Sequence, residues 1–447
     1  DLNPIAVKIS QTCLSAVDPE VLNQTFETIR GKLQSVINRL YTVEENGEET
    51  LVTHTIWKDG RPLEVWYETK DRKKSVREGR EIDAAMSENP AVMPDWYPQS
   101  EMYENSRINV GKGQRVCDLF TKRALVGLSL IAREIRSIED VRVRNVFELT
   151  LSGTLSQASN LVFVIRRRKK NGGLSDRAEV GSWVVGYWVP EEHFEINVWN
   201  CFENRYRRIL KGEKEINSIF AGLPERYAEE NVTLFNGSAT ELPLEDDSVD
   251  YVFIDPPHSN RILYMEMSLM WNAWLQMESD IAWEKEIVVS EAKARNKTQE
   301  NYHELLDRAF SEIHRVLKGG RFFSMAFNCL DDDTWLETLN MFLRYGFELC
   351  DIVPLEYSAT SVIQDNRKNA LKTDFVLTFK NAENKGQREI TFQSDACGLE
   401  NKIEQLLKKA PDAEVYHIMN ALFAETIPEG YIYRVSRIVK KCAELMP

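Results

Sequence analysis

The chain lacks several features that would assign it to a protein class directly. Its seven cysteines are scattered and none forms a C-x-x-C pair, so neither a zinc ribbon nor a disulfide framework is indicated. The histidines show no metal-ligand spacing, and there is no G-x-S-x-G or Walker-type loop. No apolar run approaches the ~20 residues that span a bilayer, and no signal peptide is found. We therefore expect a cytoplasmic protein that does not contact a membrane.

The chain also lacks a basic charge balance. It has 56 Lys and Arg against 70 Asp and Glu, a formal net charge of −14. This argues against a protein coated with nucleic acid, but it is compatible with a local basic groove, because steering depends on the local field. At 447 residues, with 43% hydrophobic and 28% charged content, the composition is that of an ordinary soluble protein of one to three domains.

The apolar spacing predicts mainly helices in the first half of the chain. Helical periods cover residues 4–42, 115–135, 141–160 and 194–210. Residues 51–67 predict a hairpin around Asp59-Gly60, because Asp-Gly favours a tight turn between two strands. Residues 161–165 are strand-like. The charged stretch 70–112 is expected to be a long loop.

Strands and helices alternate from residue 230 onward, which indicates a parallel, doubly wound sheet with a late antiparallel strand. The predicted strands are 232–235, 251–254, 321–327, 347–354 and 375–379, and the predicted helices are 263–277, 302–317 and 334–345. Residues 384–447 are expected to form a polar linker and a small helical tail.

The motif Asp255-Pro256-Pro257-His258 follows the strand-like run 251–254. An exocyclic amine of adenine or cytosine is a poor nucleophile, and a site that methylates it needs acceptors for the amine hydrogens. The Asp255 carboxylate suits this task, because open α/β sheets place ligands at the carboxyl ends of their strands. The Pro256 carbonyl can accept the second hydrogen, since proline offers no N–H to engage it locally. A ring at His258 can stack on a base rotated out of its helix. The simpler alternative is a turn that only ends a strand.

The stretch around this motif resembles a known family. Residues 236–257 resemble the pattern N/D-G-x-A-x-x-L-P-x-x-D-x-S-V-D-x-V-x-x-D-P-P of S-adenosylmethionine-dependent DNA amino-methyltransferases, and residues 318–320 resemble the family's L-K-P-G-G turn without its proline. Residues 1–6 resemble the segment G-x-D-x-N-P-x-A that ends the family's second strand. Further similarity to large adenine-specific DNA methylases linked to phage defence lies at Tyr97-Pro98, 118–123, 197–199 and 260–264.

The resemblance implies S-adenosyl-L-methionine as cofactor. It implies that Asp1 holds the ribose hydroxyls, which a carboxylate at a strand end can do by accepting two hydrogens. The other cofactor-binding residues implied are Asn3, Pro4, Asn236, Gly237, Ser238 and Ala239.

Two departures from the family pattern stand out. The glycine-rich first loop is missing, and we expect it to precede Asp1 or to be supplied by another polypeptide. His258 stands where tyrosine or phenylalanine is usual, and imidazole offers a smaller stacking surface with added hydrogen-bonding capacity.

The resemblance also implies a fold class and a division of the chain. We expect an α/β, Rossmann-like methyltransferase sheet, incomplete at its N-terminal side, with a large mixed, mainly helical insertion and a small helical C-terminal tail. The expected parts are the remainder of the first half of the sheet (1–42), the insertion (43–228), the catalytic half (229–383) and the tail (384–447).

The insertion is the candidate for gripping DNA or a partner. Its basic run, which begins Arg166, Arg167, Arg168 and Lys169, is interpreted as a phosphate-contacting loop or, equally, as a solvated loop. Tyr264 is the aromatic residue nearest the catalytic turn and is a candidate for contact with the target base.

The expected function is methyl transfer from S-adenosylmethionine to N6 of adenine in double-stranded DNA, in a restriction-modification or phage-defence system. Two alternatives stay open. One is methylation of N4 of cytosine or of an RNA base. The other is a non-catalytic subunit that keeps the fold and serves recognition or assembly in a defence complex.

Overall fold

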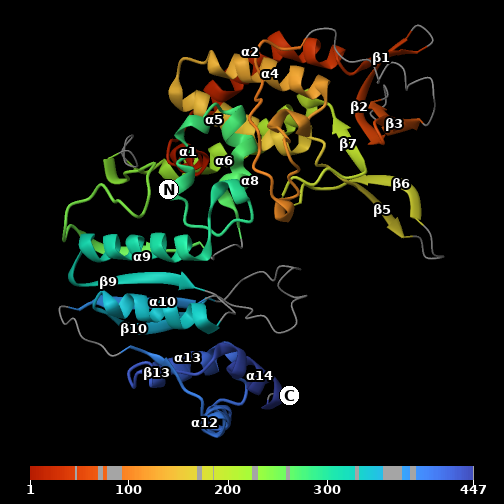
Figure 1. Cartoon of the computed structure of the whole chain (residues 1–447). Coiled ribbons are helices and arrows are strands. Elements are labelled where there is room, and N and C mark those ends of the chain that lie inside the picture. Colours follow the sequence, from red (N-terminus) through yellow and green to blue (C-terminus); the bar gives the residue numbers. More distant parts are fainter. Residues whose placement is uncertain are drawn as a thin grey trace. The chain divides into compact units, whose positions relative to one another are not determined.

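The computed structural model describes most of the chain (Figure 1). The described residues are 1–45, 48–68, 74–77, 93–168, 174–184, 186–223, 230–257, 262–327, 332–355, 375–382 and 389–445. They form two compact units of mixed α/β structure. The first unit consists of Asp1–Gly237, Leu263–Glu286 and Ser290–Asn296, and the second of Ser238–Ile262, Ile287–Val289 and Lys297–Pro447.

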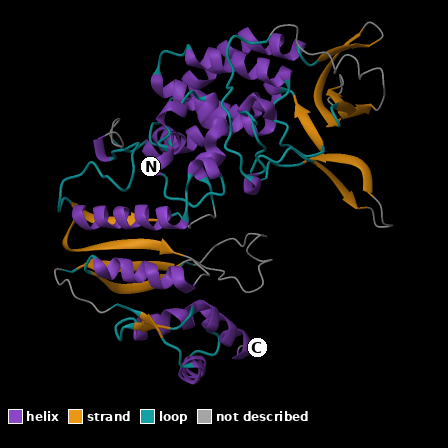
Figure 2. Ribbon diagram, in the orientation of Figure 1, coloured by secondary structure: helices purple, strands orange, loops and turns teal. Residues whose placement is uncertain are grey.

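Helices dominate the first unit (Figure 2). They are α1 (Pro4–Cys13), α2 (Pro19–Arg39), α4 (Lys122–Arg136), α5 (Val141–Ala158), α6 (Val198–Phe220) and α8 (Tyr264–Trp274). Local sequence sets several of their starts. Asp18, before Pro19, accepts the backbone N–H of Glu20, and Asn197 caps α6 by accepting from Trp199 and Asn200. The expected helices at 4–42 and 141–160 are confirmed.

An antiparallel sheet lies beside these helices in the first unit. It contains β1 (Thr42–Glu45), β2 (Glu48–Lys58), β3 (Arg61–Glu68), β4 (Lys74–Arg77) and β7 (Glu192–Ile196). The predicted hairpin is confirmed as β2 and β3, and both turn residues, Asp59 and Gly60, have positive φ angles of 48° and 73°. A separate ribbon pairs β5 (Val164–Arg168) with β6 (Leu174–Val180).

The second unit contains a four-stranded sheet. Its strands are β8 (Val249–Ile254), β9 (Leu317–Phe327), β10 (Phe347–Pro354) and β11 (Phe375–Asn381), in the order β10-β11-β9-β8. β8 is parallel to β9, whereas β11 is antiparallel to both β9 and β10. β8, β9 and β10 therefore run in one direction. β11, the last of the four along the chain, runs in the opposite direction, as expected.

Helices and the C-terminal residues complete the core of this unit. α9 (Gln299–Val316) and α10 (Asp332–Arg344) precede and follow β9, and Gly346, with a φ of 82°, follows α10. The tail contains α12 (Ala396–Lys409), α13 (Val415–Thr426), α14 (Val435–Leu445) and the short pair β12 (Thr391–Phe392) and β13 (Tyr431–Ile432). Trp335 of α10 is fully buried against Phe423 of α13, so the tail shares the hydrophobic core of the sheet.

Three local predictions were wrong. Residues 232–235 form no strand. Residues 192–196, partly assigned to a helix, form strand β7, because they pair with β2 far away in the sequence. Residues 74–77, expected in a loop, form β4. Among the helices that the structure describes, none has both the length and the apolar character needed to cross a membrane.

Candidate functional site

The acidic motif residue lies at the carboxyl end of a parallel strand. β8 ends at Ile254, and Asp255 follows it with an exposed side chain, while Pro256 and Pro257 are half-buried. Val252 and Ile254 pack against the core of the second unit, which fixes the strand below the motif. His258 lies outside the described residues, so its assignment stays a prediction.

The loop that leads into β8 is held by an arginine that the motif analysis did not single out. Arg315 of α9 donates to the backbone carbonyls of Leu242 and Leu244 at 3.0 and 2.8 Å and to the carboxylate of Asp246 at 2.6 Å. Glu312, one turn earlier, pairs with Arg315 and accepts the N–H of Leu242 at 2.8 Å. Arg315 and Glu312 therefore hold the segment from Leu242 to Asp246 against α9.

A tyrosine of the same helix contacts the motif Asp255-Pro256-Pro257. The hydroxyl of Tyr302 donates to the carbonyl of Pro257 at 2.8 Å. Sequence reasoning missed this residue because it lies in a helix, outside the pattern that carries the resemblance.

Two segments that were predicted to border the cofactor lie side by side in the first unit. The Asp1 nitrogen donates to the Phe235 carbonyl at 3.0 Å, and the Gly237 N–H donates to the Asp1 carbonyl at 3.1 Å. The side-chain amide of Asn236 adds a hydrogen bond to the same Asp1 carbonyl at 3.1 Å. This is the hydrogen-bond pattern of a parallel bridge. These bonds join residue 1 to residues 235–237, two segments whose proximity was predicted only from the resemblance to the family's motifs.

The side chains of these residues differ in exposure. Asp1 is exposed, and its Oδ1 accepts the N–H of Asn3 at 2.8 Å. Asn236 and Gly237 are exposed. In the second unit Ser238 is buried, with its hydroxyl 2.8 Å from that of Thr240, and Ala239 is exposed.

Asn3 and Pro4 have a structural role as well. Pro4 is the first residue of α1, where a missing N–H is tolerated. The buried Asn3 side chain donates to the Ser268 hydroxyl at 2.8 Å and accepts from the Asn272 amide at 3.1 Å. The Asn3 side chain therefore ties α1 to α8. Its assignment to the cofactor stays a prediction.

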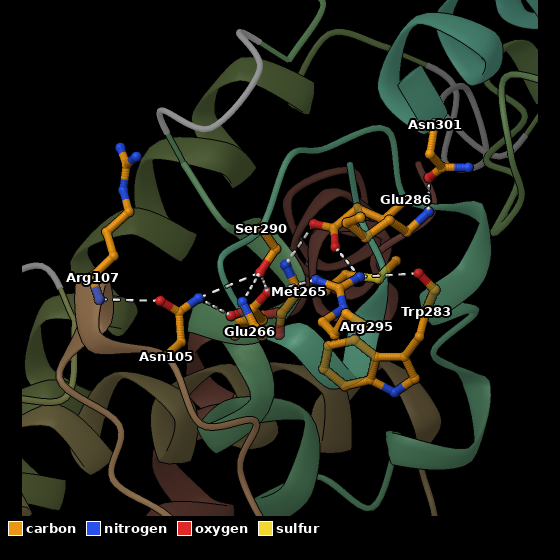
Figure 3. Close-up of polar contacts among 12 residues, drawn as sticks. Asn105, Arg107, Met265, Glu266, Trp283, Glu286, Ser290, Arg295 and Asn301 are labelled. Atoms are coloured by element: carbon orange, nitrogen blue, oxygen red, sulfur yellow. Dashed lines mark hydrogen bonds and ion pairs between the residues drawn. The ribbon is translucent and has the colours of Figure 1, made fainter. Parts of the chain in front are cut away.

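Helix α8, which follows the Asp255-Pro256-Pro257 motif, has a buried ionic network at its first turn (Figure 3). Arg295 donates to Glu266 at 2.8 Å and pairs with Glu286 at 2.6 Å, and the Glu286 carboxylate also accepts the N–H of Met265 at 3.0 Å. Glu266 further accepts from Asn105 at 2.7 Å and from Ser290 at 2.5 Å. Burial raises the pKa of Glu286, although Arg295 opposes the shift.

This network fixes the first turn of α8 to residues that lie far away in the sequence. The Arg295 side chain also stacks on Trp283, with 4.8 Å between the guanidinium carbon and the ring centroid. Tyr264, the first residue of α8, is half exposed. Its contact with the target base stays a prediction.

The basic run of the insertion lies on the β5–β6 ribbon. Arg166 donates to Glu192 at 3.3 Å, and Arg167 pairs with Glu179 at 2.9 Å. Arg168 ends β5, whereas Lys169 lies outside the described residues. Two of the cations are therefore paired within the chain. Among the described residues, no group of His, Cys, Asp and Glu side chains could hold a metal ion.

Comparisons with known proteins add little to this description. No protein-family model matches the chain, and no curated protein matches it. A chain of a solved complex between the Haloferax volcanii Trm112 methyltransferase activator and a candidate methyltransferase matches with 12% identity and a TM-score of 0.19, covering 39% of this chain and 80% of that chain. The functional conclusions below therefore depend on the residues of the chain itself.

Proposed function

We propose that this chain carries the catalytic residues of an S-adenosylmethionine-dependent DNA methyltransferase that modifies N6 of adenine. The observation that carries the proposal is the position of Asp255, exposed at the carboxyl end of a strand that runs parallel to its neighbour and followed by two prolines. Ligands of open α/β sheets bind at this edge. The sheet, with its one reversed strand, supports a Rossmann-like fold.

The proposed chemistry needs two hydrogen-bond acceptors at the amine. The Asp255 carboxylate accepts one amine hydrogen and the Pro256 carbonyl accepts the other, which draws the nitrogen lone pair out of the ring. The nitrogen would then be able to attack the electrophilic methyl group that bound S-adenosylmethionine would supply, with the thioether as the leaving group. The amine proton leaves through Asp255 to water. His258 would stack on the extruded base.

The cofactor-side residues fit the group that the proposal requires. S-adenosylmethionine supplies an electrophilic methyl group when it is bound. The exposed Asp1 carboxylate can accept ribose hydroxyls, and the backbone N–H of Gly237 holds the neighbouring segment against the Asp1 carbonyl. In the proposal Asp1, Asn3 and Pro4 form one wall, and residues 236–239 border the cofactor adenine.

The proposed substrate is double-stranded DNA, in a restriction-modification or phage-defence setting. The β5–β6 ribbon, with Arg166 to Lys169, would contact phosphates, and Tyr264 would contact the target base. A further polypeptide that supplies a glycine-rich cofactor loop is part of the same proposal.

The test is transfer of tritiated methyl groups to DNA by the full-length protein and its Asp255→Ala variant. Loss of the acceptor should lower incorporation by about 10²- to 10⁴-fold. Glu245→Ala, which removes an exposed carboxylate from the same motif, is the matched control and should stay active. Undiminished incorporation by Asp255→Ala would refute the assignment.

The product identifies the substrate. Mass analysis of digested nucleosides should detect N6-methyladenine. Detection of N4-methylcytosine or of a methylated RNA nucleoside would instead reassign the reaction. Absence of cofactor binding in calorimetry would support the alternative that this chain is a non-catalytic recognition or assembly subunit.

A further inference from the structure

We propose that Tyr302 is a positioning residue for the turn Asp255-Pro256-Pro257. The proposal rests on the proposed function, in which Asp255 and the Pro256 carbonyl accept the amine hydrogens. The Tyr302 hydroxyl donates to the Pro257 carbonyl at 2.8 Å, within the second unit and across 45 residues of sequence.

The position of the Tyr302 hydroxyl is well defined. Thr298 caps α9 by accepting the N–H of Asn301 at 3.3 Å, and its carbonyl accepts the N–H of Tyr302 at 3.0 Å. The Tyr302 side chain is 5% exposed and belongs to the hydrophobic core cluster that includes Leu306 and Phe310. A tyrosine side chain has few rotatable bonds, so packing the ring also fixes the oxygen.

The turn needs a donor from outside because of its two prolines. Pro256 and Pro257 carry no N–H, so neither can contribute a backbone donor to hold the turn. Their rings fix φ, which leaves ψ as the soft backbone angle at each residue. A hydrogen bond to the Pro257 carbonyl restrains ψ of Pro257. It therefore sets the direction of this carbonyl.

The same contact holds the far end of the turn that carries the proposed acceptors. Ile254 packs against the core before the turn, and Tyr302 holds the Pro257 carbonyl after it. Asp255 and Pro256 lie between these two fixed points, so they keep a narrower range of orientations. Catalysis by positioning is sensitive to displacements of about 1 Å, so losing this restraint should slow the methyl-transfer step.

The experiment compares Tyr302→Phe with Tyr345→Phe. Both remove one tyrosine hydroxyl from the second unit, and Tyr345 donates to Asp307 at 2.9 Å, away from the motif. We expect Tyr302→Phe to lower kcat by about 10-fold with KM values for DNA and cofactor changed by less than about 2-fold, because the lost contact orients acceptors without binding substrate. Tyr345→Phe should keep kcat within about 2-fold of the unaltered protein.

A second readout does not depend on activity. Hydrogen exchange of a peptide spanning residues 249–257, which covers β8 and the turn, should be faster in Tyr302→Phe than in the unaltered protein or in Tyr345→Phe. If the unaltered protein transfers no methyl groups, this faster exchange still supports the restraint while the proposed function fails. If Asp255→Ala is inactive but Tyr302→Phe keeps full kcat and unchanged exchange, the positioning role is overturned and the proposed function stands. Equal exchange in the unaltered protein, Tyr302→Phe and Tyr345→Phe overturns the positioning role of Tyr302, whether or not the protein transfers methyl groups.

Discussion

The guanidinium of Arg295 donates to the carboxylate of Glu266 over 2.8 Å, and both side chains are 1% exposed. A second carboxylate, Glu286, lies 2.6 Å from the same guanidinium. An ion pair buried this completely adds little net stability, but removing one member leaves an uncompensated charge in the interior.

Arg295→Met should therefore destabilise the protein strongly. The variant leaves Glu266 and Glu286 buried without their cation, and we expect a loss of about 3–5 kcal/mol in the free energy of unfolding. Urea denaturation followed by tryptophan fluorescence measures this loss. The matched control is Arg167→Met, because the Arg167–Glu179 pair is exposed and should contribute less than about 1 kcal/mol. Equal effects of the two substitutions would contradict the assignment of Arg295 to a buried network.

Stability should also depend on pH through Glu213. This residue lies on α6 with a buried side chain that accepts the N–H of Val17 at 3.4 Å, and burial raises its pKa to about 7. An unfolded glutamate releases its proton near pH 4.5, whereas the folded protein holds it until about pH 7. Over this window the folded state binds more protons than the unfolded state, so stability falls as pH rises.

Glu213→Gln should abolish this part of the pH dependence. We expect the unaltered protein to lose about 1–2 kcal/mol relative to the variant between pH 5 and pH 8, because glutamine carries no proton to release. Denaturation curves at several pH values give the comparison. Glu215→Gln, an exposed neighbour on the same helix, should leave the profile unchanged. Parallel profiles for the unaltered protein and Glu213→Gln would rule out this role for Glu213.

Under the proposed function, the ribbon arginines should contribute only modestly to DNA affinity. Arg167 is paired with Glu179, so part of its charge is already neutralised within the chain. For Arg167→Ala we expect weaker binding to every sequence and a slope of log K against log salt reduced by at most about 1. Fluorescence anisotropy at several salt concentrations measures the slope. Arg207→Ala, which removes an exposed arginine from α6, should not change it.

The sequence was informative where structure depends on near neighbours. The Asp59-Gly60 turn follows from residue types that accept positive φ, and the end of β8 follows from an apolar run that stops at Asp255. These elements depend on patterns a few residues long.

Long-range contacts explain what the sequence did not predict. β7 is a strand because it pairs with β2. The capping residue Asn197 marks locally where the helix begins, but the strand before it depends on the distant partner. Residues 232–235 are apolar enough for a strand, yet Val232 and Phe235 stay exposed. Tyr302 and Arg315 reach the motif segment only because α9 folds against it, so no spacing rule could have found them.

The hydrogen bonds between Asp1 and the segment ending at Gly237 have a consequence for how the chain can change. The chain leaves this contact after Asn3 and returns to it at Phe235. The long excursion in between is thus a closed loop whose two ends meet, and closed loops tolerate changes of length and content at low entropic cost. The part of the chain between Asn3 and Phe235 can therefore change in length or content while Asp1 and Gly237 remain neighbours.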